Sequence, residues 1–222
     1  MKISIIIPIL NEQTIIGKTL LALQPLRKNG HEIIVVDGGS SDDTFQLVNL
    51  VDNFLLSESG RAKQMNLGAK SAQHEILLFL HADTFLPTNA DKLIIEGLTK
   101  KYAWGRFNVC LSGTAKLLRV VERMMNWRSC WTGIATGDQA IFVRQDLYKQ
   151  IQGFPDIPLM EDIAISKQLK YLSSPLCIKE PVITSSRRWE QNGIIKTIFL
   201  MWNLRLAYAL GVSPHKLHKY YK

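Results

Sequence analysis

The segment EILLFLHADTFLP, residues 75–87, holds an uninterrupted apolar run from Ile76 to Leu80 and turns polar at His81. A short apolar run bounded by polar residues is typical of a strand that is buried on both faces. An imidazole and a carboxylate, those of His81 and Asp83, follow immediately. The segment therefore predicts a buried strand that places reactive side chains at its end.

Strands and helices alternate outward from this segment. We expect strands over residues 2–9, 31–37 and 53–58, and helices over residues 12–23, 41–51, 61–72 and 89–101. Strands that alternate with helices and are rich in Ile, Val and Leu indicate an α/β fold. The prediction is a Rossmann-like, mostly parallel central sheet flanked by helices. Ligands bind such a sheet at the carboxyl ends of its strands.

The second half of the chain is less regular. Strands are expected over residues 103–112 and 175–184, a strand entering a helix over 137–151, and helices over 114–127, 160–172 and 194–212. Gly211 and Pro214 are expected to end the last helix. Because no linker is visible, residues 1–222 are predicted to form one domain, with 190–222 as a basic helical C-terminal extension.

The formal net charge of +8 is concentrated in the last part of the chain. Residues 163–222 carry ten Lys or Arg against two acids, Glu180 and Glu190, whereas residues 1–162 are balanced. Such a field attracts phosphates, nucleic acid or an anionic membrane. No nucleic-acid-binding module is recognisable, so nucleic acid is the least favoured partner.

The apolar helix expected over residues 194–212 has two interpretations. It is interrupted by Lys196, Asn203 and Arg205, and we expect it to pack on the core or at a homodimer interface. The alternative is peripheral attachment to an anionic membrane, with Trp202 and the lysines of the C-terminus facing the headgroups: Lys216, Lys219 and Lys222.

The cysteines and the N-terminus indicate the compartment. Cys110, Cys130 and Cys177 are few, odd in number and far apart, which favours a reducing, cytoplasmic location. MKISIIIPILNE could imitate a signal peptide, but Pro8 and Asn11 interrupt it and no cleavage site follows. We expect a cytoplasmic protein, with attachment to the inner face of the membrane as the alternative.

Acidic residues follow several strands and begin one helix. Asp37 stands in VVDGGSSDDT, where it either faces a ligand or forms an Asx turn. Asp83 is a hard oxygen ligand suited to Mg²⁺ or Mn²⁺, or a capping residue in a turn. Glu161 and Asp162 either complement a helix dipole or supply a general base. The glycine-rich motif of dinucleotide folds is absent after the first strand, which argues against a dehydrogenase.

Two basic segments are candidates for binding phosphate. Arg187 and Arg188 are either solvated or hold phosphate oxygens through forked hydrogen bonds. Arg61 and Gln64 lie at the start of an expected helix, where anions are favoured, although an ordinary surface helix explains them equally well.

Taken in order from Ile3 to about Lys170, six segments resemble the family 2 glycosyltransferases, which have the GT-A fold. They are SIIIPILNE, IIVVDGGSSDDT, GRAKQMNLGA, LLFLHADT, GDQAIFVRQDLYKQIQGFP and MEDIAISKQL. The order of the set is more specific than any single motif. The chain looks most like the small, soluble members of the family.

The resemblance implies roles for individual residues. The nucleotide-sugar pocket would be formed by Pro8, Asn11, Glu12, Asp37, Arg61, Gln64, His81 and Asp83. Sugar or acceptor contacts would come from Gly137, Asp138, Gln139 and Glu161. Asp162 matches the acid that removes the acceptor's proton in inverting members. Asp83 matches the last acid of the Asp-X-Asp metal motif, and Arg187 or Arg188 would add positive charge at the diphosphate.

The sequence departs from the family pattern in three places. His81 replaces the first acid of Asp-X-Asp and could itself ligate a metal, and Gly38 replaces the second of two frequent aspartates. The RRW segment is similar to an element of processive synthases but lacks its glutamine, which favours non-processive transfer.

The resemblance implies transfer of a sugar from a nucleoside diphosphate donor, with a UDP-sugar favoured, with inversion and with Mg²⁺ or Mn²⁺. The acceptor would be an unknown hydroxyl, in one version lipid-linked. Two alternatives stay open: a nucleotide-sugar-binding protein with a degenerate site, and a sugar nucleotidyltransferase, which would need an early glycine-rich loop.

Overall fold

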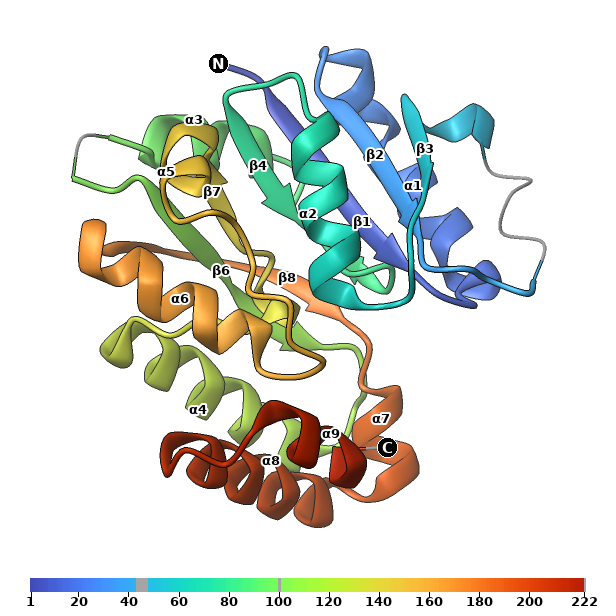
Figure 1. Cartoon of the computed structure of the whole chain (residues 1–222). Helices are drawn as coiled ribbons and strands as arrows, with labels where there is room; N and C mark the ends of the chain where they lie inside the picture. The colour runs from blue at the N-terminus through green and yellow to red at the C-terminus, as the bar shows by residue number, and fades with distance from the viewer. Residues whose placement is uncertain (43–47, 100, 222) are drawn as a thin grey trace.

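A computed structural model of the chain describes residues 1–42, 48–99 and 101–221, and shows one central sheet with helices packed against it (Figure 1). The strands are β1 (Ile3–Ile9), β2 (Glu32–Asp37), β3 (Asn53–Leu56), β4 (Ile76–Phe79), β5 (Thr84–Phe85), β6 (Trp104–Leu111), β7 (Phe142–Arg144) and β8 (Pro175–Thr184). The helices are α1 (Gln13–Lys28), α2 (Arg61–Ser71), α3 (Ala90–Gly97), α4 (Lys116–Thr132), α5 (Gln145–Gln150), α6 (Glu161–Leu172), α7 (Arg187–Asn192), α8 (Ile194–Ala209) and α9 (Pro214–Tyr221), with a 3-10 turn η2 (Gly137–Gln139).

The sheet of the described residues has the order β3-β2-β1-β4-β7-β6-β8-β5. The pairs β1–β2, β1–β4, β2–β3 and β6–β8 are parallel. β7 lies antiparallel between β4 and β6, and β5 pairs antiparallel with β8. The expected mixed α/β architecture with a mostly parallel sheet is confirmed, and β7 joins its two halves.

Successive residues of the central strands enter two different cores. Ile5 and Ile7 belong to the cluster that includes Leu20 of α1, whereas Ile6 belongs to the cluster that includes Met65 of α2. Because side chains alternate along a strand, a sheet buried on both faces needs a nearly continuous apolar run. This explains why the strands near the middle of the sheet read as uninterrupted apolar sequence.

The element boundaries differ from expectation mainly in the second half. α4 continues to Thr132, where Gly133 adopts a left-handed conformation and ends it, and α8 ends at Ala209. β5, α7 and α9 are additional elements. Of the helix expected over residues 41–51, residues 43–47 lie outside the described part of the chain, and residues 48–50 form a 3-10 turn.

The C-terminal helices pack over the start of α6. Leu204 of α8 and Leu217 of α9 share a buried cluster with Leu159, Met160 and Ile163. Within the described ranges, none of the helices has the length and apolar character that crossing a bilayer requires. Through this shared cluster, α8 and α9 cover the start of α6, where Glu161 and Asp162 lie.

Candidate functional site

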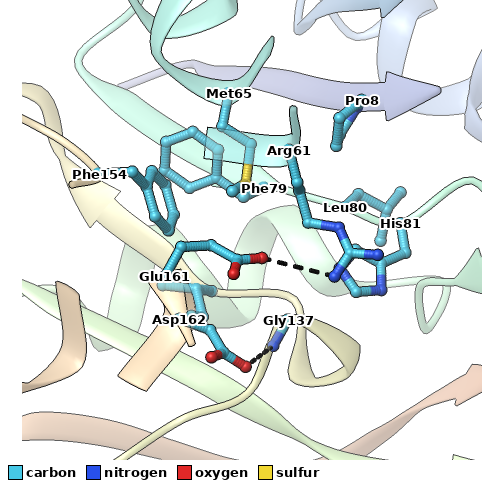
Figure 2. Close-up of a pocket in the computed structure, with 11 residues that line it drawn as sticks. Pro8, Arg61, Met65, Phe79, Leu80, His81, Gly137, Phe154, Glu161 and Asp162 are labelled. Carbon is cyan, nitrogen blue, oxygen red and sulfur yellow. Dashed lines mark hydrogen bonds and ion pairs between the residues drawn. The ribbon is translucent and has the colours of Figure 1, made fainter. Parts of the chain in front are cut away.

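A cleft lies at the carboxyl ends of β1 and β4, facing the start of α6 (Figure 2). Its polar lining comes from Arg61, His81, Glu161 and Asp162, and Pro8 closes one side. The sheet supplies Pro8 and His81 from neighbouring strand ends, and the two helix starts supply the other polar side chains. Parallel strand ends and helix N-termini together form the kind of place where α/β sheets bind anionic ligands.

Asp162 is held in a fixed orientation at the start of α6. Its Oδ2 accepts a hydrogen bond from the Gly137 amide at 3.1 Å, and its Oδ1 accepts one from the Ile163 amide at 2.7 Å. Met160, which precedes the helix, has a φ of 68°. This left-handed residue turns the chain so that both acids enter the cleft.

The neighbouring acid, Glu161, is buried, and the pKa of its carboxyl is raised. Burial raises the pKa of its carboxyl, and the charge of Asp162 raises it further. The guanidinium of Arg61, with Nη1 3.5 Å from Oε1, opposes that rise. Two adjacent acids in different surroundings are a common arrangement for proton transfer.

His81 follows the end of β4 and packs against η2. Its Nδ1 lies 3.2 Å from Oδ1 of Asp138, and its Nε2 is buried without a hydrogen-bond partner among the described residues. Burial alone would raise the pKa of Asp138, but His81 and then Arg61 lower it below its ordinary value. One ring nitrogen therefore faces Asp138, and the other lies so close to Gly137 that a Cβ atom there would come within 2.4 Å of it.

Asp83 and Glu12 form a second group of acids beside the cleft. The Asp83 carboxylate has no hydrogen-bond or ion-pair partner within the described part of the chain. Burial raises the pKa of Glu12, Arg187 lowers it from a distance of 3.7 Å between Nη2 and Oε2, and Asp83 raises it. Acids from the β1 and β4 ends and an arginine from α7 therefore meet at one edge of the sheet.

Other residues that the sequence predicted to bind the nucleotide sugar lie in the scaffold around the cleft. Asp37 is buried, and its Oδ1 accepts hydrogen bonds from the Gly39 amide and from the amide and hydroxyl of Ser40, so it forms the Asx turn. Nε2 of buried Gln64 donates to the carbonyls of Ile9 and Val36, tying β1 to β2.

Two further candidates also make structural hydrogen bonds. Oδ1 of Asn11 accepts a hydrogen bond from the Ser41 amide at 2.8 Å, which connects the loops after β1 and β2. Gln139 is fully buried, and its Oε1 accepts from the Thr136 amide at 3.2 Å. Neither side chain is part of the cleft lining.

The paired arginines point in different directions. Arg187 faces Glu12, as described above. Arg188 stacks on Tyr221, with its guanidinium carbon 3.7 Å from the ring centroid, and donates from Nη2 to the Tyr221 carbonyl at 2.5 Å. Arg187 thus lies beside Glu12, whereas Arg188 holds α9 in place.

Two arginines that the sequence did not single out lie near Asp162. Burial, followed by the charge of Arg205, lowers the pKa of Arg128 to about 10, and burial lowers that of Arg205, while Asp162 acts in the opposite direction on both. Neither forms an ion pair with any described carboxylate. In the sequence, Arg205 stands out as a charge within an apolar helix, whereas no pattern distinguishes Arg128.

Residues 4–149 match the family model described as Glycosyl transferase family 2. Over 236 aligned residues the chain is 25% identical to the probable glycosyltransferase YdaM of Bacillus subtilis, an alignment that covers 95% of this chain and 55% of that protein. The chain thus spans little more than half of this relative.

Solved structures share the fold. The Staphylococcus aureus protein TarS, residues 1–349, in complex with UDP-GlcNAc has a TM-score of 0.64 at 21% identity, covering 83% of this chain and 58% of that one. Glucosyl-3-phosphoglycerate synthase of Mycobacterium tuberculosis with Mn²⁺, UDP and phosphoglyceric acid has a TM-score of 0.63 at 16% identity, covering 95% and 79%. The expected GT-A fold is confirmed.

Proposed function

Because the chain belongs to glycosyl transferase family 2, we propose that it transfers a sugar from a nucleoside diphosphate donor to an acceptor hydroxyl. The observation that carries the proposal is the single cleft in which Arg61, Glu161 and Asp162 meet at the strand ends. A UDP-sugar is the favoured donor, since the similar TarS structure holds UDP-GlcNAc and the mycobacterial synthase holds UDP.

Asp162 is the proposed general base. In an inverting reaction the acceptor oxygen attacks the anomeric carbon, the bond from that carbon to the diphosphate oxygen breaks, and the acceptor's proton passes to the carboxylate. The Gly137 and Ile163 amides hold the carboxylate in place for this transfer. Arg61 and Arg187, which pair with Glu161 and Glu12, are the proposed sources of positive charge for the departing diphosphate.

Asp83 is the proposed protein ligand of Mg²⁺ or Mn²⁺. Its unpaired carboxylate fits such an ion, and the described residues contain no group of three candidate ligands. Mg²⁺ keeps several waters and takes phosphate oxygens of its substrate as ligands, so one carboxylate can hold it beside the diphosphate. When bound, such an ion neutralises charge on the leaving diphosphate.

Arg128 and Arg205 favour an acceptor that carries negative charge close to its reacting hydroxyl. Both guanidinium groups lie near the proposed base without a carboxylate partner among the described residues. A phosphate or carboxylate group on the acceptor, free or lipid-linked, would supply that partner. The donor sugar would be chosen by the side chains of the cleft.

The deciding experiment begins with a panel of nucleotide sugars, measuring release of nucleoside diphosphate with and without Mn²⁺. Asp162→Asn should then reduce transfer by about 10²- to 10⁴-fold, because a positioned base contributes about that much. UDP affinity, measured by calorimetry, should be unchanged. Asp156→Asn, at an exposed acid outside the cleft, is the matched control. Full turnover by Asp162→Asn would refute the assignment.

A further inference from the structure

Helix α4 leaves an unusual number of large apolar side chains in solvent. Leu117, Val120, Met124, Trp127 and Trp131 are all exposed, and they follow one another at intervals of three or four residues. That spacing places them along one face of the helix. Trp127 and Trp131 are 67% and 77% exposed and stack with ring centroids 5.5 Å apart.

Helix α8 repeats the pattern. Ile195, Phe199, Trp202 and Leu206 of the helix, and Leu210 directly after its end, are exposed and are spaced in the same way. The opposite face of α8 is the one that packs on the protein, through Leu204. Exposed apolar residues scattered singly are ordinary, but two aligned rows are not.

The two rows belong to adjoining helices. Ile194 and Ile198 of α8 pack against Leu118 and Val121 of α4, and Figure 1 shows α4 and α8 side by side at the bottom of the molecule. The apolar face, as we call the two rows together, thus lies on neighbouring helices on the side of the molecule away from the outer strand β3.

The charges around the apolar face are positive. Lys116 and Arg123 of α4, Lys196 of α8, and Lys216 and Lys219 of α9 are exposed. The only acid in α4, Glu122, is buried and pairs with Arg119 at 2.9 Å. No Asp or Glu occurs in the sequence from residue 191 to the end. Lys222 lies outside the described residues.

We propose that the apolar face of α4 and α8 docks the protein on the surface of an anionic lipid membrane. Helices that lie in a membrane interface combine an apolar row containing Trp or Phe with flanking Lys and Arg. Tryptophan rings favour the level of the headgroups, and anionic lipids attract the flanking cations. A second copy of the chain would bring like charges together, so charge complementarity selects the membrane over a homodimer.

The test measures binding of the full chain to vesicles by flotation. Vesicles of phosphatidylglycerol and phosphatidylcholine in equal parts should bind the protein, and vesicles of phosphatidylcholine alone should bind it at least about tenfold less. Binding to the mixed vesicles should weaken as salt is added, because salt screens exposed charges. Tryptophan fluorescence should shift to the blue as the rings leave water.

Two double variants address the apolar face directly. Trp127→Gln with Trp131→Gln, and Phe199→Gln with Trp202→Gln, should each weaken vesicle binding by about tenfold or more. Leu56→Gln with Tyr171→Gln is the matched control, since these side chains are 71% and 87% exposed elsewhere. Unchanged melting temperature and UDP affinity would show that the variants fold. Failure of the intact protein to bind anionic vesicles, or equal binding by all variants, would overturn the proposal.

A dimer is the remaining outcome, and sedimentation velocity detects it. If the intact protein is a dimer in solution and the same double variants make it monomeric, the apolar face is an interface between copies and the membrane proposal is wrong. These experiments test membrane binding independently of sugar transfer, because none of the substituted residues lies in the cleft.

Discussion

At position 137 the lack of a side chain allows His81 to lie beside the cleft. A Cβ atom at Gly137 would come within 2.4 Å of His81 Nε2, a distance that real contacts do not allow. The Gly137 amide also donates to Asp162. One small residue therefore sets the positions of both the imidazole and the proposed base.

Gly137→Ala should destabilise the fold by about 1–3 kcal/mol, the usual cost of overpacking, and should lower transfer by displacing His81 or the amide. Urea unfolding gives the free energy. Adding His81→Ala to the same chain should restore most of the stability, since it removes the colliding ring. No recovery in the double variant would mean that the strain lies elsewhere.

Glu161 should make stability depend on pH. Its folded pKa is raised above the ordinary value of 4.5, so the folded state binds more protons than the unfolded chain through that window. Stability from this group is present below pH 4.5 and is lost as pH rises through the folded value.

Glu161→Gln removes this titration. The melting temperature of the variant should therefore rise relative to that of the wild type as pH increases from about 4 to about 7. A difference of 1 kcal/mol corresponds to about 2–4 °C in a chain of this size. Scanning calorimetry across that range supplies the measurement. A constant difference at every pH would show that Glu161 does not titrate as described.

At the scale of residues, the sequence predicted which residues belong to the region of the site better than it predicted how deeply each side chain is buried. Asp162 and Arg61 line the cleft as the motifs indicated, whereas Gln64 and Gln139 are buried and bond to the surrounding chain. A motif fixes the order of residues along the chain, but burial depends on what packs above them. Arg128 becomes relevant only through the charge of Asp162, a residue 34 positions further along the chain, and no local pattern predicts that interaction.

At the scale of elements, the start of α6 depends on helices far along the chain. Leu217 of α9 is buried against the cluster that includes Met160, and α9 is fastened by the stack of Arg188 on Tyr221. The left-handed Met160 is thereby held under the C-terminal extension.

Leu217→Ala should cost about 2–5 kcal/mol and should loosen the start of α6, because it leaves a cavity in the cluster. Hydrogen exchange at the Ile163 and Gly137 amides should accelerate relative to the central strands. Leu210→Ala, at a site 77% exposed, is the control and should leave both stability and exchange unchanged. Equal effects of the two substitutions would contradict the account.

Most elements could be predicted from periodicity, and the exceptions have physical reasons. β5 has only two residues and exists through pairing with β8, a partner one hundred residues away. α9 is a short amphipathic helix that begins at Pro214, a residue interpreted as a stop. The helix expected to continue to Val212 ends at Ala209, because Gly211, with a φ of 89°, turns the chain away from the helix.

At the scale of the whole molecule, the two halves of the sheet divide the proposed chemistry. Asp83 follows a strand of the first half, and Asp162 comes from a helix of the second. Asp83→Asn should therefore abolish the gain in UDP affinity that Mn²⁺ provides, whereas Asp162→Asn should leave that gain intact. Calorimetry of UDP with Mn²⁺ and with a chelator measures both. The same loss in both variants would contradict this division.

The antiparallel strand β7 pairs with β4 but is synthesised much later, so the order of synthesis affects folding. Once residue 79 has left the ribosome, β3, β2, β1 and β4 can pair, but the outer edge of β4 has no partner until residues 142–144 emerge. An unpaired apolar edge is a template for pairing with other chains. The nascent polypeptide thus carries an open edge while residues 80–141 are synthesised, and shielding by chaperones matters most in that interval.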